Sequence, residues 1–199
     1  MKRICVFCGS NSGIRTEYRK AAKKLGQILV SKNFGLVYGG ASVGIMAVVA
    51  DTVLAKGGEV IGVMPQFLVE KEVAHKNLSD LRIVDSMHAR KLLMAELSDG
   101  FIAMPGGFGT FDEFFEVLTW GQLRMHNKPC GILNTCQYYS HLLNFLDYAV
   151  TEKFIGPPHR SMILVDENPQ TLLEKFETYQ PPDVKKWLDA RNDSLLNPI

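Results

Sequence analysis

Apolar residues along this chain fall into short continuous runs separated by longer stretches in which apolar and polar residues alternate with helical spacing. A continuous apolar run is typical of a parallel strand that is buried on both faces. Glycine, proline or polar turn residues follow most of these runs. We therefore predict seven short strands, at residues 4–7, 36–38, 59–64, 81–84, 101–104, 129–133 and 162–165.

Helical periodicity fills most of the intervals between these runs. In the first interval Ala22, Leu25 and Leu29 share one face of a helix. Strands that alternate with helices predict an α/β fold with an open, largely parallel sheet and helices on both faces. Residues 66–80 follow neither pattern, and a long irregular connection is often a functional loop. The predicted helices are residues 18–31, 44–56, 87–97, 110–124, 139–152 and 169–179.

Length, composition and charge are those of an ordinary soluble domain. The chain has 199 residues, which suits one domain, predicted at residues 1–180 with a polar C-terminal tail at residues 181–199. The formal net charge of +1 gives no general attraction to nucleic acid or anionic membrane, so any anion site must be local. No apolar run is long enough for a membrane span or a signal peptide. We expect a cytoplasmic protein with neither nucleic acid nor membrane as a partner.

The four cysteines do not form a metal-binding pattern. Cys5 and Cys8 form a C-x-x-C, but Cys130 and Cys136 are too widely spaced to complete a zinc ribbon. Cys5 also lies within an apolar strand pattern. We therefore expect buried thiols rather than a metal or redox site.

Small-residue turns follow three of the predicted strands, at Gly9, Gly39 and Gly106. In an open parallel sheet, ligands bind outside the carboxyl ends of the strands. Glycines let the backbone approach a ligand, and a helix start offers unpaired N–H groups to an anion. The third turn is followed by two carboxylates, Asp112 and Glu113. We predict a phosphate-bearing ligand at this turn, with a carboxylate beside it.

Glu113 has two competing interpretations. Thr110 and Glu113 have the spacing of a capping box, which stabilises a helix start by about 1 kcal/mol and needs no ligand. A glutamate that reaches back to its own cap cannot also point at a substrate. Asp112 could supply the negative charge that a first helical turn favours, which would leave Glu113 free for catalysis.

Arg90 and Lys91 are harder to explain by local stability. Ser86 fits the N-cap, which puts both cations in or just past the first helical turn. Positive charge there opposes the helix dipole by about 0.3–1 kcal/mol for each exposed residue. Positions that work against local stability more often serve a ligand, and arginine binds phosphate in fork fashion. The alternative is a solvated basic pair.

The predicted helix at residues 110–124 is apolar on most of its faces. A helix of this kind is buried, and one of its sides can be buried by another subunit. We therefore expect a homodimer with this helix at or near the interface. Thr119 on the same helix could face either the core or the site. The apolar residues are Phe111, Phe114, Phe115, Val117, Leu118, Trp120 and Leu123.

Four segments together resemble the LOG (Lonely Guy) family of cytokinin riboside 5′-monophosphate phosphoribohydrolases, many of which were first labelled lysine decarboxylases. Residues 105–113 fit the family signature P-G-G-x-G-T-x-x-E, and residues 87–91 are similar to its second motif. Residues 6–10 and 39–46 resemble its two N-terminal glycine turns. The likeness covers residues 3–157, and Ala41 departs from it where a third glycine is expected.

The resemblance implies a Rossmann-like fold, a homodimer, and hydrolysis of a purine nucleoside 5′-monophosphate to free base and ribose 5-phosphate. AMP and cytokinin riboside monophosphates are the implied substrates, and no metal or cofactor is implied. Catalytic roles are implied for Arg90 and Glu113. The implied substrate contacts are Glu72, Arg90, Lys91, Gly107, Phe108, Gly109, Thr110, Phe111, Asp112, Glu113 and Thr119.

Two functions of other classes compete with this one. A non-catalytic nucleotide carrier, resembling molybdenum-cofactor carriers, would need the glycine turns but not Arg90 and Glu113 together. A pyridoxal phosphate decarboxylase would need a Schiff-base lysine in cofactor-binding surroundings, and usually a much longer chain. No lysine in this sequence stands in such a setting.

Overall fold

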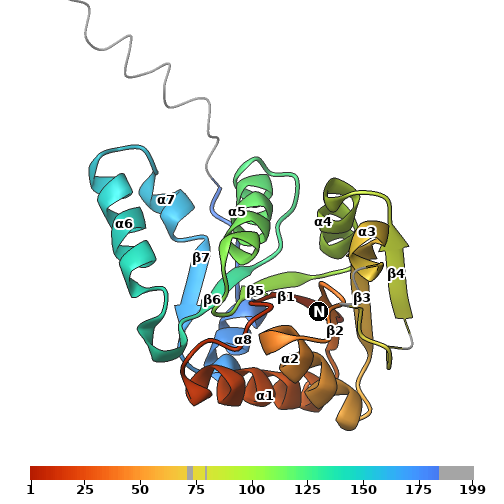
Figure 1. Ribbon diagram of the computed structural model, residues 1–199. Helices are drawn as coiled ribbons and strands as arrows, with labels where there is room; N and C mark the ends of the chain where they lie inside the picture. Colours follow the sequence, from red (N-terminus) through yellow and green to blue (C-terminus); the bar gives the residue numbers. More distant parts are fainter. Residues whose placement is uncertain (71–73, 79, 184–199) are drawn as a thin grey trace, which may run out of the picture.

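A single parallel sheet organises the chain. The computed structural model describes residues 1–70, 74–78 and 80–183, and within them seven strands pair in the order β4-β3-β2-β1-β5-β6-β7 (Figure 1). Every pairing is parallel. The predicted open α/β sheet is confirmed. The strands are β1 (Arg3–Phe7), β2 (Gly35–Tyr38), β3 (Val60–Pro65), β4 (Asp80–Val84), β5 (Gly100–Ala103), β6 (Cys130–Leu133) and β7 (Ile163–Asp166).

Helices cover both faces of the sheet, as predicted. Figure 1 shows α1, α2 and α8 on one face, and α4, α5 and α6 on the other. The helices are α1 (Thr16–Ser31), α2 (Gly44–Ala55), α3 (Gln66–Val69), α4 (Met87–Glu96), α5 (Phe108–Gln122), α6 (Ser140–Thr151), α7 (Pro157–Arg160) and α8 (Pro169–Glu177), with a 3-10 turn η1 (Thr135–Gln137).

The central strand β1 explains why the apolar runs are continuous. Ile4 and Val6 pack into the core beneath α1, α2 and α8. The alternate residues Cys5 and Phe7 pack into the core beneath α4, α5 and α6. Side chains alternate across a strand, so a strand covered on both faces buries every residue and needs an apolar one at each position.

The predicted elements match the observed ones to within two residues at each end. Three short elements were not predicted: α3, η1 and α7. Helix α3 occupies the beginning of the connection at residues 66–80, for which the sequence predicts no regular structure. Elements of one turn do not repeat an apolar period, so their sequence carries no periodic signal. None of the described helices is both long and apolar enough to cross a membrane.

The strand order creates a switch point beside β1. From β1 the chain builds outward to β4 on one side, and then returns to build β5, β6 and β7 on the other side. At such a point the connections leaving neighbouring strands diverge to opposite faces of the sheet, which opens a crevice at their carboxyl ends. The turns at Gly9 and Gly106 follow β1 and β5, so both lie at this crevice.

Candidate active site

Hydrogen bonds join the three small-residue turns. The N–H of Gly9 donates to the carbonyl oxygen of Pro105 at 3.1 Å. The carbonyl oxygen of Gly9 accepts from the N–H of Ile45 at 3.0 Å, which connects the turn after β2. The turns that follow β1, β2 and β5 therefore form one surface at the edge of the sheet, where the sequence predicted a ligand.

A cavity of about 230 Å³ lies on this surface. Six of the predicted site residues line it: Arg90, Gly107, Phe108, Gly109, Thr110 and Glu113. Five lining residues had not been assigned to the site: Cys8, Gly9, Ser10, Gly39 and Met46. Their turns had been recognised from the sequence, but only the strand order decides which turn residues face the same cavity.

Arg90 reaches the cavity from the first turns of α4. The N-cap predicted at Ser86 is confirmed, because its hydroxyl accepts from the N–H of Ala89 at 3.1 Å. The Arg90 side chain is buried, and its Nε donates to the carbonyl oxygen of Val63 at 3.0 Å. This bond to β3 fixes the guanidinium over the carboxyl ends of the strands. Arg90 is therefore not part of a solvated basic pair.

Arg90 and Glu113 form a buried ion pair. Arg90 Nη1 lies 3.1 Å from Glu113 Oε1, and each side chain is only 10% exposed. Burial raises the pKa of Glu113, and the neighbouring guanidinium partly opposes that rise. The pair joins α4 to α5 and places a cation and a carboxylate side by side in the cavity.

The capping-box interpretation of Glu113 is wrong. Helix α5 begins at Phe108 with Gly107 as its N-cap, and no side chain caps it. Thr110 is thus the third helical residue, and its hydroxyl packs so closely on Gly106 that a Cβ there would collide with it. Glu113 lies a turn further into the helix than a capping glutamate, and its carboxylate pairs with Arg90 instead.

Lys91 points to α5 rather than into the cavity. Its Nζ lies 3.1 Å from Asp112 Oδ2 and 3.0 Å from Glu116 Oε2. Burial opposes the charged ammonium, but hydrogen bonding to Glu116 and Asp112 outweighs it and raises the pKa of Lys91. Lys91 and Asp112, both predicted substrate contacts, are thus partners of each other in this structure.

The three remaining predicted contacts lie away from the cavity or outside the described residues. Phe111 packs edge-on against Tyr139, with ring centroids 6.1 Å apart. Thr119 is exposed, and its hydroxyl donates to the carbonyl oxygen of Phe115 at 2.7 Å. Glu72 lies outside the described residues, as do residues 184–199 of the predicted tail.

Gly39 contributes space to the site. A Cβ built on Gly39 would collide with Arg90 Nη2. Only a residue without a side chain at the end of β2 leaves room for the guanidinium in its observed position. The sequence marked Gly39 as a turn residue but gave no sign that an arginine from α4 lies against it.

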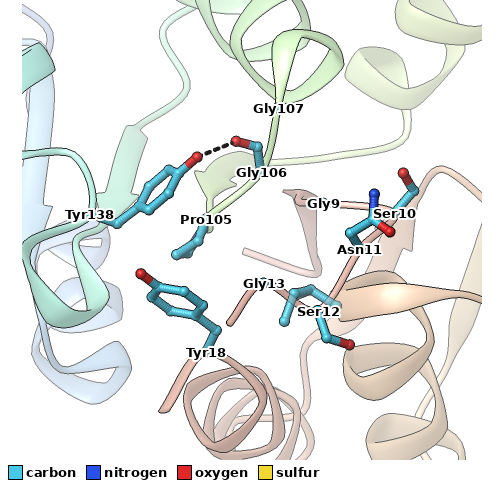
Figure 2. Close-up of a pocket in the computed structure, with 11 residues that line it drawn as sticks. Gly9, Ser10, Asn11, Ser12, Gly13, Tyr18, Pro105, Gly106, Gly107 and Tyr138 are labelled. Atoms are coloured by element: carbon cyan, nitrogen blue, oxygen red, sulfur yellow. Dashed lines mark hydrogen bonds between the residues drawn. The ribbon is translucent and has the colours of Figure 1, made fainter. Parts of the chain in front are cut away.

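A second cavity, of about 300 Å³, adjoins the first and shares Gly9, Ser10 and Gly107 with it. Figure 2 shows Tyr18 and Tyr138 on one side of this cavity and the turn after β1 on the other. The Tyr138 hydroxyl donates to the carbonyl oxygen of Gly106 at 2.7 Å. The tyrosine is not part of any motif recognised in the sequence.

The four cysteines are free thiols, and the predicted burial is confirmed for three of them. Cys5, Cys8 and Cys130 are buried and Cys136 is partly buried. Burial raises the pKa of Cys130 to about 12, so this thiol stays protonated near neutral pH. Within the described part of the chain, no cluster of three histidine, cysteine or acidic side chains is arranged to hold a metal ion.

Comparison with known sequences gives one consistent group of relatives. The family model described as "Possible lysine decarboxylase" matches residues 46–176. The chain is 48% identical over 180 residues to a probable cytokinin riboside 5′-monophosphate phosphoribohydrolase (LOGL6) of Oryza sativa subsp. japonica, covering 90% of this chain and 72% of that protein. It is 47% identical over 180 residues to cytokinin riboside 5′-monophosphate phosphoribohydrolase LOG1 of Arabidopsis thaliana, covering 90% and 84%.

Two solved structures with the same fold are more distant in sequence than these relatives. The molybdenum cofactor binding protein of Rippkaea orientalis superposes with a TM-score of 0.68 at 22% identity, covering 89% of this chain and 97% of that one. The molybdenum cofactor carrier protein of Chlamydomonas reinhardtii gives a TM-score of 0.67 at 18% identity, covering 89% and 99%. At these identities the likeness establishes the Rossmann-like fold alone.

Proposed function

Because the chain belongs to the LOG family of cytokinin riboside 5′-monophosphate phosphoribohydrolases, we propose that it hydrolyses the N-glycosidic bond of a purine riboside 5′-monophosphate. The products are the free base and ribose 5-phosphate. The observation that carries this proposal is the buried pair of Arg90 and Glu113, 3.1 Å apart beside a glycine turn at a helix start.

The start of α5 suits the 5′-phosphate. The first N–H groups of a helix have no acceptor within the helix, and the helix dipole adds positive potential at this end. Gly107 and Gly109 have no neighbouring atom within 4 Å of the place where a Cβ would stand. An anion can therefore approach the backbone closely, and the N–H groups from Gly107 to Thr110 can donate to its oxygens.

Glu113 suits the reacting sugar. Cleavage of an N-glycosidic bond passes through a state with oxocarbenium character, which a nearby carboxylate stabilises. The bond from C1′ to the base breaks with its electron pair going to the base, and a water oxygen bonds to C1′. Glu113 can orient that water and accept its proton, which then passes to the departing base and gives the neutral free base. The low exposure of the carboxylate strengthens its electrostatic effect on the sugar.

Arg90 supplies the complementary charge. An arginine guanidinium is a cation with five N–H donors and no acceptor. Beside Glu113 it opposes protonation of the carboxylate, and it offers a donor to the departing base or to the phosphate. The same arginine cannot serve as a proton acceptor, so Glu113 is the base in this proposal.

The geometry gives no support to a decarboxylase. A lysine that forms a Schiff base must lose its proton, which burial without a counter-charge promotes. Among the described residues Lys91 is the buried lysine, and its two carboxylate partners raise its pKa. The carrier function would need only the glycine turns, whereas the paired Arg90 and Glu113 add the charges that glycoside hydrolysis requires.

Three broader features belong to the same proposal. AMP and cytokinin riboside monophosphates are the proposed substrates, and a cytoplasmic homodimer is the proposed form of the enzyme. Residues 1–180 are proposed as a single catalytic domain. Half-buried and exposed apolar residues near the end of α5 and at its C-cap, including Trp120 and Leu123, support a subunit contact near this helix.

The test is release of base by variants of the paired residues. Purified Glu113→Ala and Arg90→Ala should each remain folded but release no base from AMP or from isopentenyladenosine monophosphate. Chromatography measures the released base. Arg160→Ala and Glu174→Ala serve as controls, since Arg160 pairs with Asp147 on α6 and Glu174 is an exposed residue of α8. Near-normal turnover by either site variant would contradict the proposal.

A further inference from the structure

Two adjacent tyrosines hold the turn between β5 and α5. The Tyr139 hydroxyl donates to the carbonyl oxygen of Met104 at 2.7 Å, and the Tyr138 hydroxyl donates to that of Gly106 at 2.7 Å. The carbonyl oxygen between them, that of Pro105, accepts from the N–H of Gly9. Three successive carbonyl groups thus each have a donor from another segment of the chain, and Figure 2 shows the bond from Tyr138.

These bonds also fix the directions of N–H groups. In a trans peptide unit the C=O and N–H bonds point to opposite sides. The carbonyl of Gly106 points to Tyr138, so the N–H of Gly107 in the same peptide unit points away from the tyrosine. Gly107 lines the cavity that holds Arg90 and Glu113. The hydroxyl of Tyr138 therefore sets the direction of a donor at the start of α5.

The backbone before the tyrosines is in a disfavoured conformation. Cys136 and Gln137 have φ of 53° and 57°, in the left-handed region that residues with a Cβ rarely adopt. Such conformations persist where the surroundings enforce them, and they cluster at functional sites. Here they turn the chain so that consecutive residues, Tyr138 and Tyr139, both reach the turn after β5.

A buried asparagine and ring contacts secure this arrangement. Asn134 Oδ1 accepts from the N–H of Tyr139 at 2.7 Å, and its Nδ2 donates to the hydroxyl of Ser140 at 3.3 Å. The rings of Tyr138 and Tyr139 meet edge-on with centroids 4.9 Å apart, and Tyr18 meets Tyr138 at 5.8 Å. Burial raises the pKa of Tyr139 well above its usual range, so its hydroxyl remains a donor.

We propose that Tyr138 and Tyr139 are positioning residues for the substrate's 5′-phosphate. The Tyr138 hydroxyl holds the carbonyl group of Gly106 away from the anion and so directs the N–H of Gly107 toward it. The Tyr139 hydroxyl holds the carbonyl group of Met104 and so fixes the beginning of the same turn. The proposal rests on the proposed function, because the phosphate of the nucleotide is the anion in question. The tyrosines act through the turn and take no part in bond cleavage.

Tyr138→Phe is the main test, because the Tyr138 side chain is partly exposed and its ring contacts survive the change. KM for AMP and the Kd for inorganic phosphate, measured by calorimetry, should each rise by about five- to tenfold, as expected for one lost hydrogen bond. The value of kcat should change by less than about twofold, because the Arg90–Glu113 pair is untouched. The unfolding temperature should stay that of the wild type.

Two further variants complete the test. Tyr139→Phe should shift KM and the phosphate Kd in the same direction, and Tyr148→Phe, which changes an exposed tyrosine of α6, should leave both unchanged. Unchanged KM and phosphate Kd in Tyr138→Phe, with normal base release, would overturn the positioning role and leave the enzyme function standing. A fall in both kcat and the unfolding temperature of Tyr138→Phe would also overturn the positioning role. Replacing a residue that only stabilises the fold would have this effect.

The failure of the enzyme function has a different signature. If the wild-type protein released no base, while Tyr138→Phe still weakened the binding of inorganic phosphate relative to Tyr148→Phe, the hydrolase proposal would be wrong. The positioning of an anion by the tyrosines would then stand on the phosphate measurement alone.

Discussion

At the scale of single residues, the central feature is the ion pair of Arg90 and Glu113, which stability alone does not explain. Burying a cation and an anion has a desolvation cost that their attraction often fails to offset, so an apolar pair would hold α4 to α5 at least as well. Arg90 and Glu113 are nevertheless both nearly buried and lie beside a cavity. The arrangement is better explained by chemistry in that cavity than by packing.

The pH dependence of activity follows from the raised pKa of Glu113. Burial raises this pKa, Arg90 partly lowers it, and the net shift is upward. Only the ionised carboxylate can stabilise a sugar cation, so activity is lost as the pH falls through the raised value. The acidic limb of kcat/KM should therefore have its midpoint above the ordinary glutamate pKa of about 4.3. A profile from pH 4 to 8 that stays flat would contradict this expectation.

Gly39→Ala should disturb catalysis without touching a charged group. The new Cβ would collide with Arg90 Nη2 and push the guanidinium from its place beside Glu113. A displacement of about 1 Å in a catalytic group can cost about a hundredfold in rate, and we expect a loss of that order in kcat/KM for AMP. Gly156→Ala, at the start of α7, is the control. Equal activity in both variants would show that the position of Arg90 does not matter.

At the scale of elements, the start of α5 decides which of its residues face the cavity. The helix begins at Phe108, so Gly107 and Gly109 lie in the exposed first turn while Thr110 is buried. Glu113 is then turned toward Arg90, and Asp112 toward Lys91 on α4. Two cations from α4 thus pair with acidic residues of α5, one pair beside the cavity and the other away from it.

Lys91→Met should test the second of these pairs. The Lys91 side chain is only 10% exposed and has two carboxylate partners that are more exposed. Its loss should lower the free energy of unfolding by about 1–2 kcal/mol, between the values for surface and buried pairs. Denaturant unfolding measures this change. An unfolding free energy equal to that of the wild type would contradict the structural role.

The same variant examines the predicted contact of Lys91 with substrate. A KM for AMP that stays at the wild-type value would remove Lys91 from the substrate contacts, whereas a raised KM would support the contact implied by the family resemblance. Lys20→Met, on an exposed position of α1, controls for the general loss of one positive charge.

At the scale of the whole molecule, the order of the strands creates the site. The turns at Gly9, Gly39 and Gly106 are far apart in the sequence and meet because β2, β1 and β5 are neighbours in the sheet. Arg90 arrives from the helix that follows β4, at the edge of the same sheet. The candidate site is therefore a property of the topology, and no local segment of the chain contains it.

The proposed homodimer is tested at this scale. The end of α5 and the turn after it carry Leu123 and Met125, which are 43% and 68% exposed. If this helix lies at or near a subunit contact, the wild-type protein should scatter light as a dimer at micromolar concentration. Leu123→Glu with Met125→Glu should shift it to the monomer, because burying the two charges would be unfavourable. A monomeric wild-type protein would end the dimer proposal.

The sequence by itself determined the alternation of strands and helices and the positions of the glycine turns. Burial on both faces imposes continuous apolar runs, and these placed all seven strands to within two residues of where they lie. The resemblance to the LOG family implied site roles for Arg90, Glu113, Gly107 and Gly109, and the structure places these four residues at one cavity. The apolar runs and the motifs are local patterns, which is why they can be read without a structure.

Only the tertiary structure decided which of these residues meet. Helix α5 begins two residues before its predicted start, so Thr110 and Glu113 do not form a capping box. Glu113 pairs with Arg90 instead. No local sequence pattern predicted that Gly39 lies against Arg90 or that Tyr138 bonds to the turn after β5. These contacts join segments that are distant in sequence. Contacts of this kind depend on strand order and helix placement, which the energy of the whole fold sets.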